Sequence, residues 1–158
     1  MDATGGSGYV GPVTDVLLAA DVPWIVDEVT AVVAGPQDNV RVVHSGEEVR
    51  AAVAEDPPDL VILDQQIGNM GSMAVCMDLR LEESAGRIDH VPVLVLLDRR
   101  ADVFLARRME AEGWLLKPLS PIRLRKAVRA LLAGERFEDP SQEPPTVAAL
   151  PAPGPGLG

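Results

Sequence analysis

Pro58-Asp59-Leu60-Val61-Ile62-Leu63-Asp64 is the stretch that decides the fold, an apolar run that follows a proline pair and ends on a carboxylate. Apolar residues in succession, without polar alternation, are typical of a parallel strand covered on both faces. Ligands of such sheets bind beyond the carboxyl ends of the strands. The sequence therefore predicts a buried strand that presents Asp64 at the functional edge of a sheet. A strand-end aspartate can also serve only as a turn former or a helix cap.

Length and composition set limits on the class of protein. The chain has 158 residues, 47% of them hydrophobic, which suits one domain with tails. A net charge of −10 argues against nucleic-acid or membrane-surface binding, because polyanions would be repelled. Cys76 is the only cysteine, so neither an intrachain disulfide nor a cysteine-based zinc site is expected. Without a signal peptide or an apolar span in the sequence, the expected location is the cytoplasm.

Strand-like and helix-like segments alternate along the chain. Besides the run that ends at Asp64, the predicted strands are Val16–Ala20, Val40–Val43, Val91–Leu97 and Trp114–Leu116. The predicted helices run from Pro23 to Gly35, from a Ser45-Gly46-Glu47-Glu48 capping box to Asp56, over Ser72–Glu83, from Asp102 to a left-handed cap at Gly113, and from Pro121 to Gly134.

This alternation predicts an α/β fold of the (βα)5 type. We expect a doubly wound parallel sheet in a flavodoxin-like three-layer sandwich, with strand order 2-1-3-4-5. The domain should span residues 13–134, after a flexible leader at 1–12 and before a disordered Pro-rich tail at 135–158. In that strand order the first and third strands are neighbours, so the acids at their ends should meet.

Three charged residues follow strands at this edge: Asp21, Asp64 and Lys117. Two neighbouring carboxylates repel each other, and a hard cation such as Mg²⁺ relieves the repulsion; the backbone carbonyl of Gln66 is a possible third ligand. Asp64 could then attack a phosphoryl donor, with Lys117 as a point charge beside it. The alternative interpretation is a lysine that forms salt bridges with two surface acids.

The motifs around these residues resemble the receiver domain of two-component response regulators, over roughly residues 13–134. They are Leu17-Leu18-Ala19-Ala20-Asp21, the run ending at Asp64 with Met70 in the next loop, and Gly113-Trp114-Leu115-Leu116-Lys117-Pro118. The resemblance implies that a histidine kinase or another phosphodonor phosphorylates Asp64 and that Asp21 binds Mg²⁺. It also implies that Lys117 contacts the phosphoryl group, that Trp114 is a switch aromatic, and that the Lys117-Pro118 peptide is cis.

Several positions depart from the pattern of that family. Ala20 stands where the first of two adjacent acids is usual, which removes a charge from the metal site. Leu97 replaces a small hydroxyl residue of the switch, and the anionic Asp98 follows it. Gly68 stands where a proline is usual in the loop after Asp64.

Three functions are compatible with these motifs. The first is an atypical single-domain response regulator that accepts a phosphoryl group on Asp64 and signals through protein contacts. The second is a phosphorylation-independent pseudo-receiver that docks proteins. The third, an Asp-nucleophile phosphohydrolase, is disfavoured because Gln66 stands where such enzymes place a general acid, so we expect no enzyme.

The expected partners are proteins. Basic residues mark the 102–132 face as a contact surface for an unidentified protein or a homodimer: Arg107, Arg108, Arg123, Lys126 and Arg129. We expect no nucleic-acid contact, since residues 138–158 cannot form a helix-turn-helix, and no membrane contact.

Overall fold

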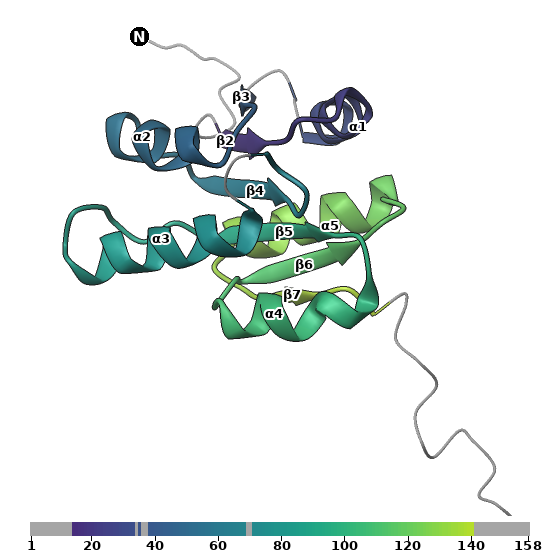
Figure 1. Cartoon of the computed structure of the whole chain (residues 1–158). Coiled ribbons are helices and arrows are strands. Elements are labelled where there is room, and N and C mark those ends of the chain that lie inside the picture. The colour runs from purple at the N-terminus through teal and green to yellow at the C-terminus, as the bar shows by residue number, and fades with distance from the viewer. Residues whose placement is uncertain (1–13, 34, 36–37, 69–70, 141–158) are drawn as a thin grey trace, which may run out of the picture.

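The computed structural model describes residues 14–33, 35, 38–68 and 71–140. They form a six-stranded sheet in the order β3-β2-β4-β5-β6-β7, and every pair of neighbours is parallel (Figure 1). The strands are β2 (Thr14–Ala19), β3 (Asp38–Val43), β4 (Leu60–Asp64), β5 (Val93–Leu97), β6 (Gly113–Leu116) and β7 (Phe137–Glu138). The first five strands have the predicted 2-1-3-4-5 order, and the flavodoxin-like (βα)5 prediction is confirmed.

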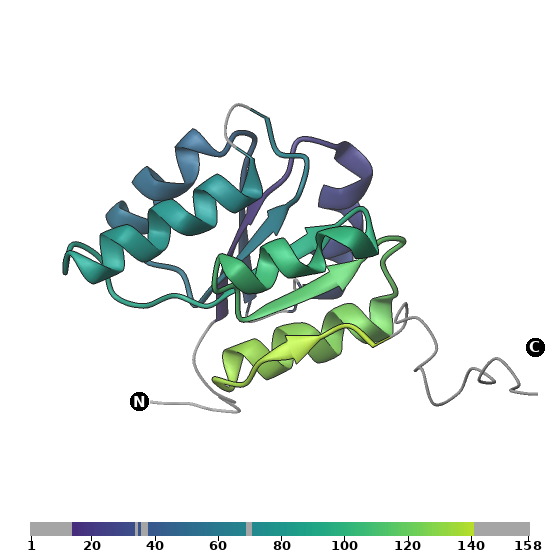
Figure 2. The same cartoon turned by 60° about the horizontal axis from the view of Figure 1, so that its bottom comes forward.

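Helices cover both faces of the sheet (Figure 2). They are α1 (Pro23–Val33), α2 (Glu47–Glu55), α3 (Ser72–Ser84), α4 (Val103–Arg108), which follows a 3-10 turn at Arg100–Asp102, and α5 (Pro121–Leu132). One core cluster joins the sheet to α2, α3 and α4, and the other joins it to α1 and α5. None of the described helices is long and apolar enough to span a membrane.

Strands β4 and β5 are buried along their whole lengths, as the unbroken apolar runs predict. Successive residues of β4 point to opposite faces, so that Val61 and Leu63 enter one cluster while Leu60 and Ile62 enter the other. Cys76 is buried, and burial raises the pKa of its thiol to about 11, as suits a packed side chain rather than a reactive thiolate.

Two local predictions are wrong. The capping box does not form, because α2 begins after Gly46, and the Ser45 hydroxyl instead donates to Glu48 Oε2 over 2.7 Å. The helix expected over 102–112 ends at Arg108, and Gly113 is the first residue of β6 rather than a left-handed cap. Glu110 takes the left-handed conformation, with φ of 61°.

The predicted start of the tail at residue 135 is also wrong. Residues 135–140 are ordered, and Phe137–Glu138 adds β7 to the edge of β6. Two residues are too few to show a strand period, so no pattern in the sequence indicated this strand. The predicted leader at 1–12 and the rest of the tail, residues 141–158, lie outside the described part of the chain.

Candidate functional site at the ends of β4, β5 and β6

Asp64 lies at the carboxyl end of the central strand β4 and has no exposed surface. The chain turns directly after it, since the Ile67 N–H donates to the Asp64 carbonyl over 3.1 Å. One carboxylate oxygen, Oδ1, is bound by a lysine. The other, Oδ2, is buried and has no hydrogen-bond partner among the described residues. A buried carboxylate oxygen without a partner is costly, and a cation or a water bound to this atom would offset that cost.

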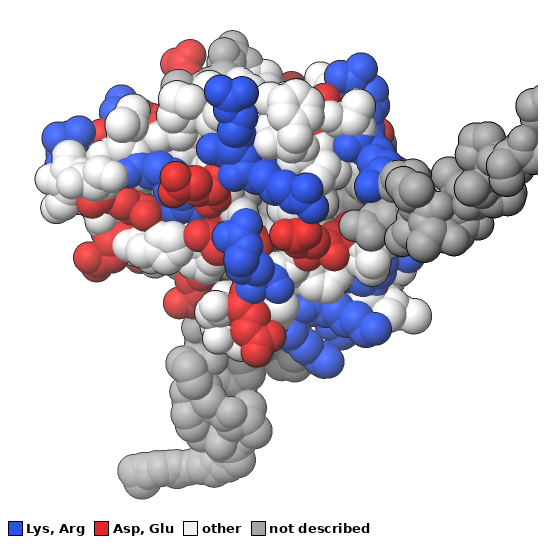
Figure 3. All heavy atoms as spheres, turned by 90° about the horizontal axis from the view of Figure 1, so that it is seen from below, with Lys and Arg blue, Asp and Glu red and all other residues white. Residues whose placement is uncertain are grey.

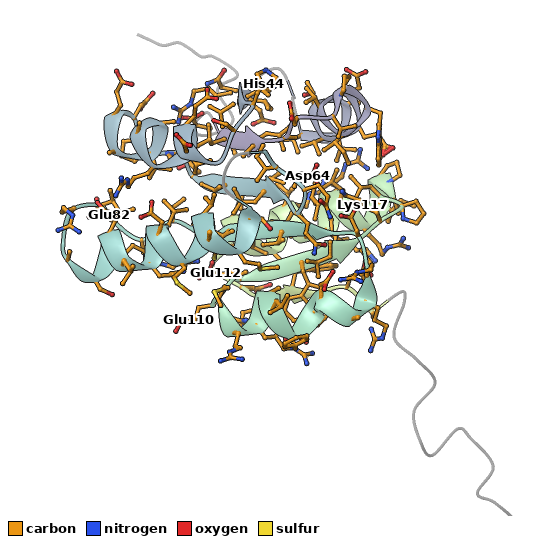
Figure 4. All side chains as sticks on the ribbon, viewed as in Figure 1. His44, Asp64, Glu82, Glu110, Glu112 and Lys117 are labelled. Atoms are coloured by element: carbon orange, nitrogen blue, oxygen red, sulfur yellow. The ribbon has the colours of Figure 1, made fainter. Side chains whose placement is uncertain are left out.

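Lys117 follows β6 and reaches across β5 to Asp64. Figure 4 shows the two side chains directed toward each other. Lys117 Nζ donates to Asp64 Oδ1 over 2.5 Å and to Asp98 Oδ1 over 2.8 Å. Burial lowers the pKa of Lys117, but its bonds to Asp64 and Asp98 outweigh this and raise the pKa above the ordinary value of 10.5. The ammonium is therefore charged at neutral pH. The predicted cis peptide between Lys117 and Pro118 is present.

A second set of contacts holds Asp98 in place. The Asp98 N–H donates to Gln65 Oε1 over 2.7 Å, and Gln65 Nε2 donates to Asp102 Oδ2, also over 2.7 Å. Arg99 binds both oxygens of Asp102. The Gln65 and Arg99 bonds together hold the pKa of Asp102 below its usual value, with Gln65 as the larger cause. Sequence reasoning missed Gln65 and Asp102, because side-chain contacts between distant segments leave no periodic signal.

Asp21 follows β2, at the same edge of the sheet as Asp64 and Lys117. Its side chain is exposed, and its Oδ2 lies close to the loop after β4: a Cβ on Gly68 would be 3.5 Å from this atom. This is an ordinary van der Waals distance, so the carboxylate packs against the loop at Gly68. Ala20, which precedes Asp21, is fully buried, and His44 Nδ1 lies 3.2 Å from its carbonyl oxygen. The structure therefore brings Asp21, Asp64 and Lys117 to one edge of the sheet, as predicted.

Comparison with known proteins identifies the family of this chain. Residues 16–129 match the family described as the response regulator receiver domain. The chain belongs to this family. The DNA-binding response regulator MtrA of Mycolicibacterium smegmatis is 32% identical over 130 residues, which make up 81% of this chain and 54% of that protein. The regulatory protein PhoP of Bacillus subtilis is 28% identical over 107 residues, or 66% of this chain and 42% of that protein. The receiver chain spans about half the length of the curated relatives it matches.

Solved structures show the same fold. A putative response regulator from Chloroflexus aurantiacus superposes with a TM-score of 0.69 at 23% identity, covering 78% of this chain and 99% of that chain. The chemotaxis response regulator CheY4 of Vibrio cholerae gives a TM-score of 0.66 at 22% identity, covering 74% and 97%. At this identity the likeness concerns the fold alone.

The two residues predicted as switch positions are both buried. Leu97 ends β5 and Trp114 lies in β6, and both pack in the core cluster on the α2, α3 and α4 face. The Arg107 guanidinium carbon lies 5.0 Å from the centre of the Trp114 ring. Leu97 has no hydrogen-bonding side chain, whereas Asp98 next to it turns toward Lys117. A carboxylate therefore follows directly after Leu97, the position at which the resemblance predicts a hydroxyl residue.

The residues present suit a divalent cation in part. Asp64 offers a buried oxygen without a partner, and Asp21 offers an exposed carboxylate beside the same loop. Gln66 is exposed in the turn after β4, where its carbonyl was predicted as a third ligand. The described residues contain no group of three His, Cys, Asp or Glu side chains that could hold a metal. Such a site matches Mg²⁺, which keeps several waters, better than a cation that needs a full set of protein ligands.

Replacing Gln65 by Ala is expected to lower the free energy of unfolding by about 1–2 kcal/mol at pH 7, because two partly buried hydrogen bonds are lost. The depressed folded pKa of Asp102 adds stability that is present above its unfolded pKa, near 3.8, and is lost as the pH falls through the folded pKa. The difference in free energy of unfolding between Gln65→Ala and the wild type should therefore become smaller at acidic pH. Urea unfolding at several pH values measures it, and Gln66→Ala, at the exposed neighbour, is the control. Equal losses in both variants would contradict the role of Gln65.

Proposed function

We propose that this chain is an atypical single-domain response regulator in a phosphorelay, which accepts a phosphoryl group on Asp64 and signals through protein contacts. The observation that carries the proposal is the Asp64 carboxylate, with Oδ1 held by Lys117 and Oδ2 buried without a partner among the described residues. A salt bridge that served only stability would be expected to satisfy both oxygens.

The proposed reaction is a transfer from a phosphodonor to a carboxylate. An oxygen of Asp64 attacks phosphorus, a P–O bond to the carboxyl group forms, and the donor's own bond to phosphorus breaks. The leaving group, a histidine nitrogen of a kinase or the anion of a small phosphodonor, departs with the electron pair of that bond and takes up a proton from water. Lys117 then pairs with the transferred oxygens as a compact positive charge. Mg²⁺, held by Asp21, Asp64 and the Gln66 carbonyl, would neutralise charge on the phosphoryl oxygens.

The charges around Asp64 predict weak phosphorylation. Ala20 removes one metal-binding carboxylate, and affinity for hard cations depends on the number of charged ligands. Asp98 also binds Lys117 and places a second negative charge beside the incoming phosphoryl group. These two features support the pseudo-receiver, a protein-docking module that acts without phosphorylation, as the second candidate.

Intact-mass measurement after incubation with acetyl phosphate separates the two candidates. We expect Mg²⁺-dependent addition of one phosphoryl group to a minor fraction of the wild type, none in Asp64→Asn, and wild-type labelling in Asp27→Asn. Asp27 is an exposed aspartate on α1 and serves as the matched control. Labelling that persists in Asp64→Asn would eliminate Asp64 as the acceptor. Absence of labelling in all three proteins would favour the pseudo-receiver.

The partners and location belong to the same proposal. A histidine kinase or a small phosphodonor supplies the phosphoryl group, and the 102–132 face contacts an output protein or a second copy. Relatives such as MtrA carry the name of DNA-binding regulators, whereas the acidic charge of this chain argues for protein contacts without nucleic acid or membrane. An enzyme role is not proposed, and the cytoplasmic location stays a prediction.

A further inference from the structure

Strand β7 lies on the outer edge of β6, within the face that carries the basic residues. Phe137 and Glu138 pair in parallel with Gly113 and Trp114, and the Phe137 N–H donates to the Glu112 carbonyl over 3.0 Å. The approach is close: a Cβ on Gly113 would lie 2.8 Å from the Phe137 carbonyl oxygen. Glycine at position 113 therefore lets an extended chain lie against this edge.

Charged side chains hold the acidic residues of this segment from both sides. Asp139 is buried, and its Oδ2 accepts a hydrogen bond from the Leu116 N–H over 2.9 Å. Its Oδ1 lies 3.5 Å from Arg123 Nε of α5. Glu138 accepts a hydrogen bond of 3.0 Å from Arg107 of α4. Arginines from the two helices beside the edge thus bind two successive acids.

Figure 3 views the molecule from the side on which β7 and α4 lie in Figure 1. Lys and Arg side chains cross the middle of this face, with Asp and Glu among them. The whole chain carries a net charge of −10, so this band of basic side chains differs in charge from the chain as a whole. A band of this kind attracts an acidic partner and orients it.

Residues 137–139 do not pair with the whole outer edge of β6, and they leave one donor atom beside it without a hydrogen bond to a described residue. The ladder covers Gly113 and Trp114, whereas the Leu116 N–H is bound by the Asp139 side chain and not by the backbone of a described strand. Arg123 Nε is buried and has no partner in hydrogen-bond geometry among the described residues, because Asp139 meets it only at ion-pair distance. A buried donor without an acceptor costs free energy, so a better placed carboxylate would bind more tightly.

We propose that the outer edge of β6, between Arg107 and Arg123, is a docking site for an extended acidic segment of a partner protein, and that residues 137–139 occupy it as an internal competitor. Such a partner adds a strand to the sheet through main-chain bonds, and its acids bind the two arginines. The inference names the chemistry of the partner for the proposed output face and does not depend on phosphorylation of Asp64.

The test uses the full chain and a labelled, terminally blocked peptide with the sequence of residues 135–140, Glu-Arg-Phe-Glu-Asp-Pro. Replacing both Glu138 and Asp139 by Ala should release the internal segment. We expect this variant to bind the peptide at least about tenfold more tightly than the wild type does, because the competitor is gone. Glu135→Ala, outside the paired residues, should bind like the wild type. A peptide with Gln and Asn in place of the acids that correspond to Glu138 and Asp139 should not bind.

Equal affinity for the wild type and the released variant, or binding that ignores the peptide's charges, would overturn the proposal. Hydrogen exchange at β4 shows whether the released variant is folded. If the released variant is not folded, the hydrogen-exchange rate of the Phe137 amide in the wild type is the test. A faster rate with added peptide supports the site, because the peptide displaces the internal segment, and an unchanged rate overturns it. A released variant that dimerises without peptide would assign the edge to a second copy and overturn the partner proposal. Repeating the titration in Asp64→Asn, where the same result is expected, separates this outcome from that of the proposed function.

Discussion

Replacement of Lys117 by Met is expected to lower the free energy of unfolding by about 3 kcal/mol at pH 7 and to abolish phosphoryl transfer to Asp64. Lys117 is the cation that binds both Asp64 and Asp98, and Asp64 is fully buried. Removing one member of a buried ion pair leaves an uncompensated charge, which costs about 3–5 kcal/mol in full burial. Partial exposure of Asp98 places the expected value at the lower end.

The raised pKa of Lys117 determines how its contribution to the free energy of unfolding changes with pH. A raised folded pKa adds stability that is complete below the unfolded pKa, near 10.5, and is lost as the pH rises through the folded value. Chemical denaturation at pH 7 should therefore show the full difference in free energy of unfolding between the wild type and Lys117→Met. Lys126→Met, an exposed lysine on α5, is the control. Adding Asp98→Asn to Lys117→Met should recover part of the loss, and a single variant as stable as the wild type would contradict the pairing.

Replacement of Trp114 by Ala is expected to lower the free energy of unfolding by about 3–5 kcal/mol, the range for removing a large side chain from a core. Trp114 is 1% exposed and is among the largest fully buried side chains of the protein. The change also removes the ring over which Arg107 lies, and Arg107 in turn binds Glu138.

Trp24→Ala is the matched control, because this tryptophan is 49% exposed and its replacement should cost about 0.5 kcal/mol or less. Trp114→Phe should fall between the two. Denaturant unfolding monitored by circular dichroism gives the three values. Near-equal losses for Trp24→Ala and Trp114→Ala would show that Trp114 is not a core residue in solution.

The parts of the fold that the sequence predicted are those in which burial alone determines the pattern. Leu60–Leu63 and Val93–Leu97 are covered on both faces, so their unbroken apolar runs identify central parallel strands. The strand-end residues Asp21, Asp64 and Lys117 followed from these assignments, since the carboxyl ends of parallel strands share one edge. The structure places all three at that edge, with Lys117 in contact with Asp64.

The parts that could not be predicted depend on contacts between distant segments. Asp139 is buried because it accepts the Leu116 N–H, and Gln65 is ordered because it joins Asp98 to Asp102. Neither contact follows a helical or strand period. Ser45 shows the opposite case, in which a local motif was present but its hydroxyl bound the Glu48 side chain instead of capping the helix.

The most direct test of the central claim is to find which residue carries the phosphoryl group. After incubation with Mg²⁺ and acetyl phosphate, borohydride reduces an aspartyl phosphate to homoserine, and peptide mapping by mass spectrometry locates the change. We predict homoserine at position 64 in the wild type and none in a sample prepared without the phosphodonor. Homoserine at Asp21 or Asp98 instead, or an unmodified Asp64 in a protein that remains folded, would contradict the account.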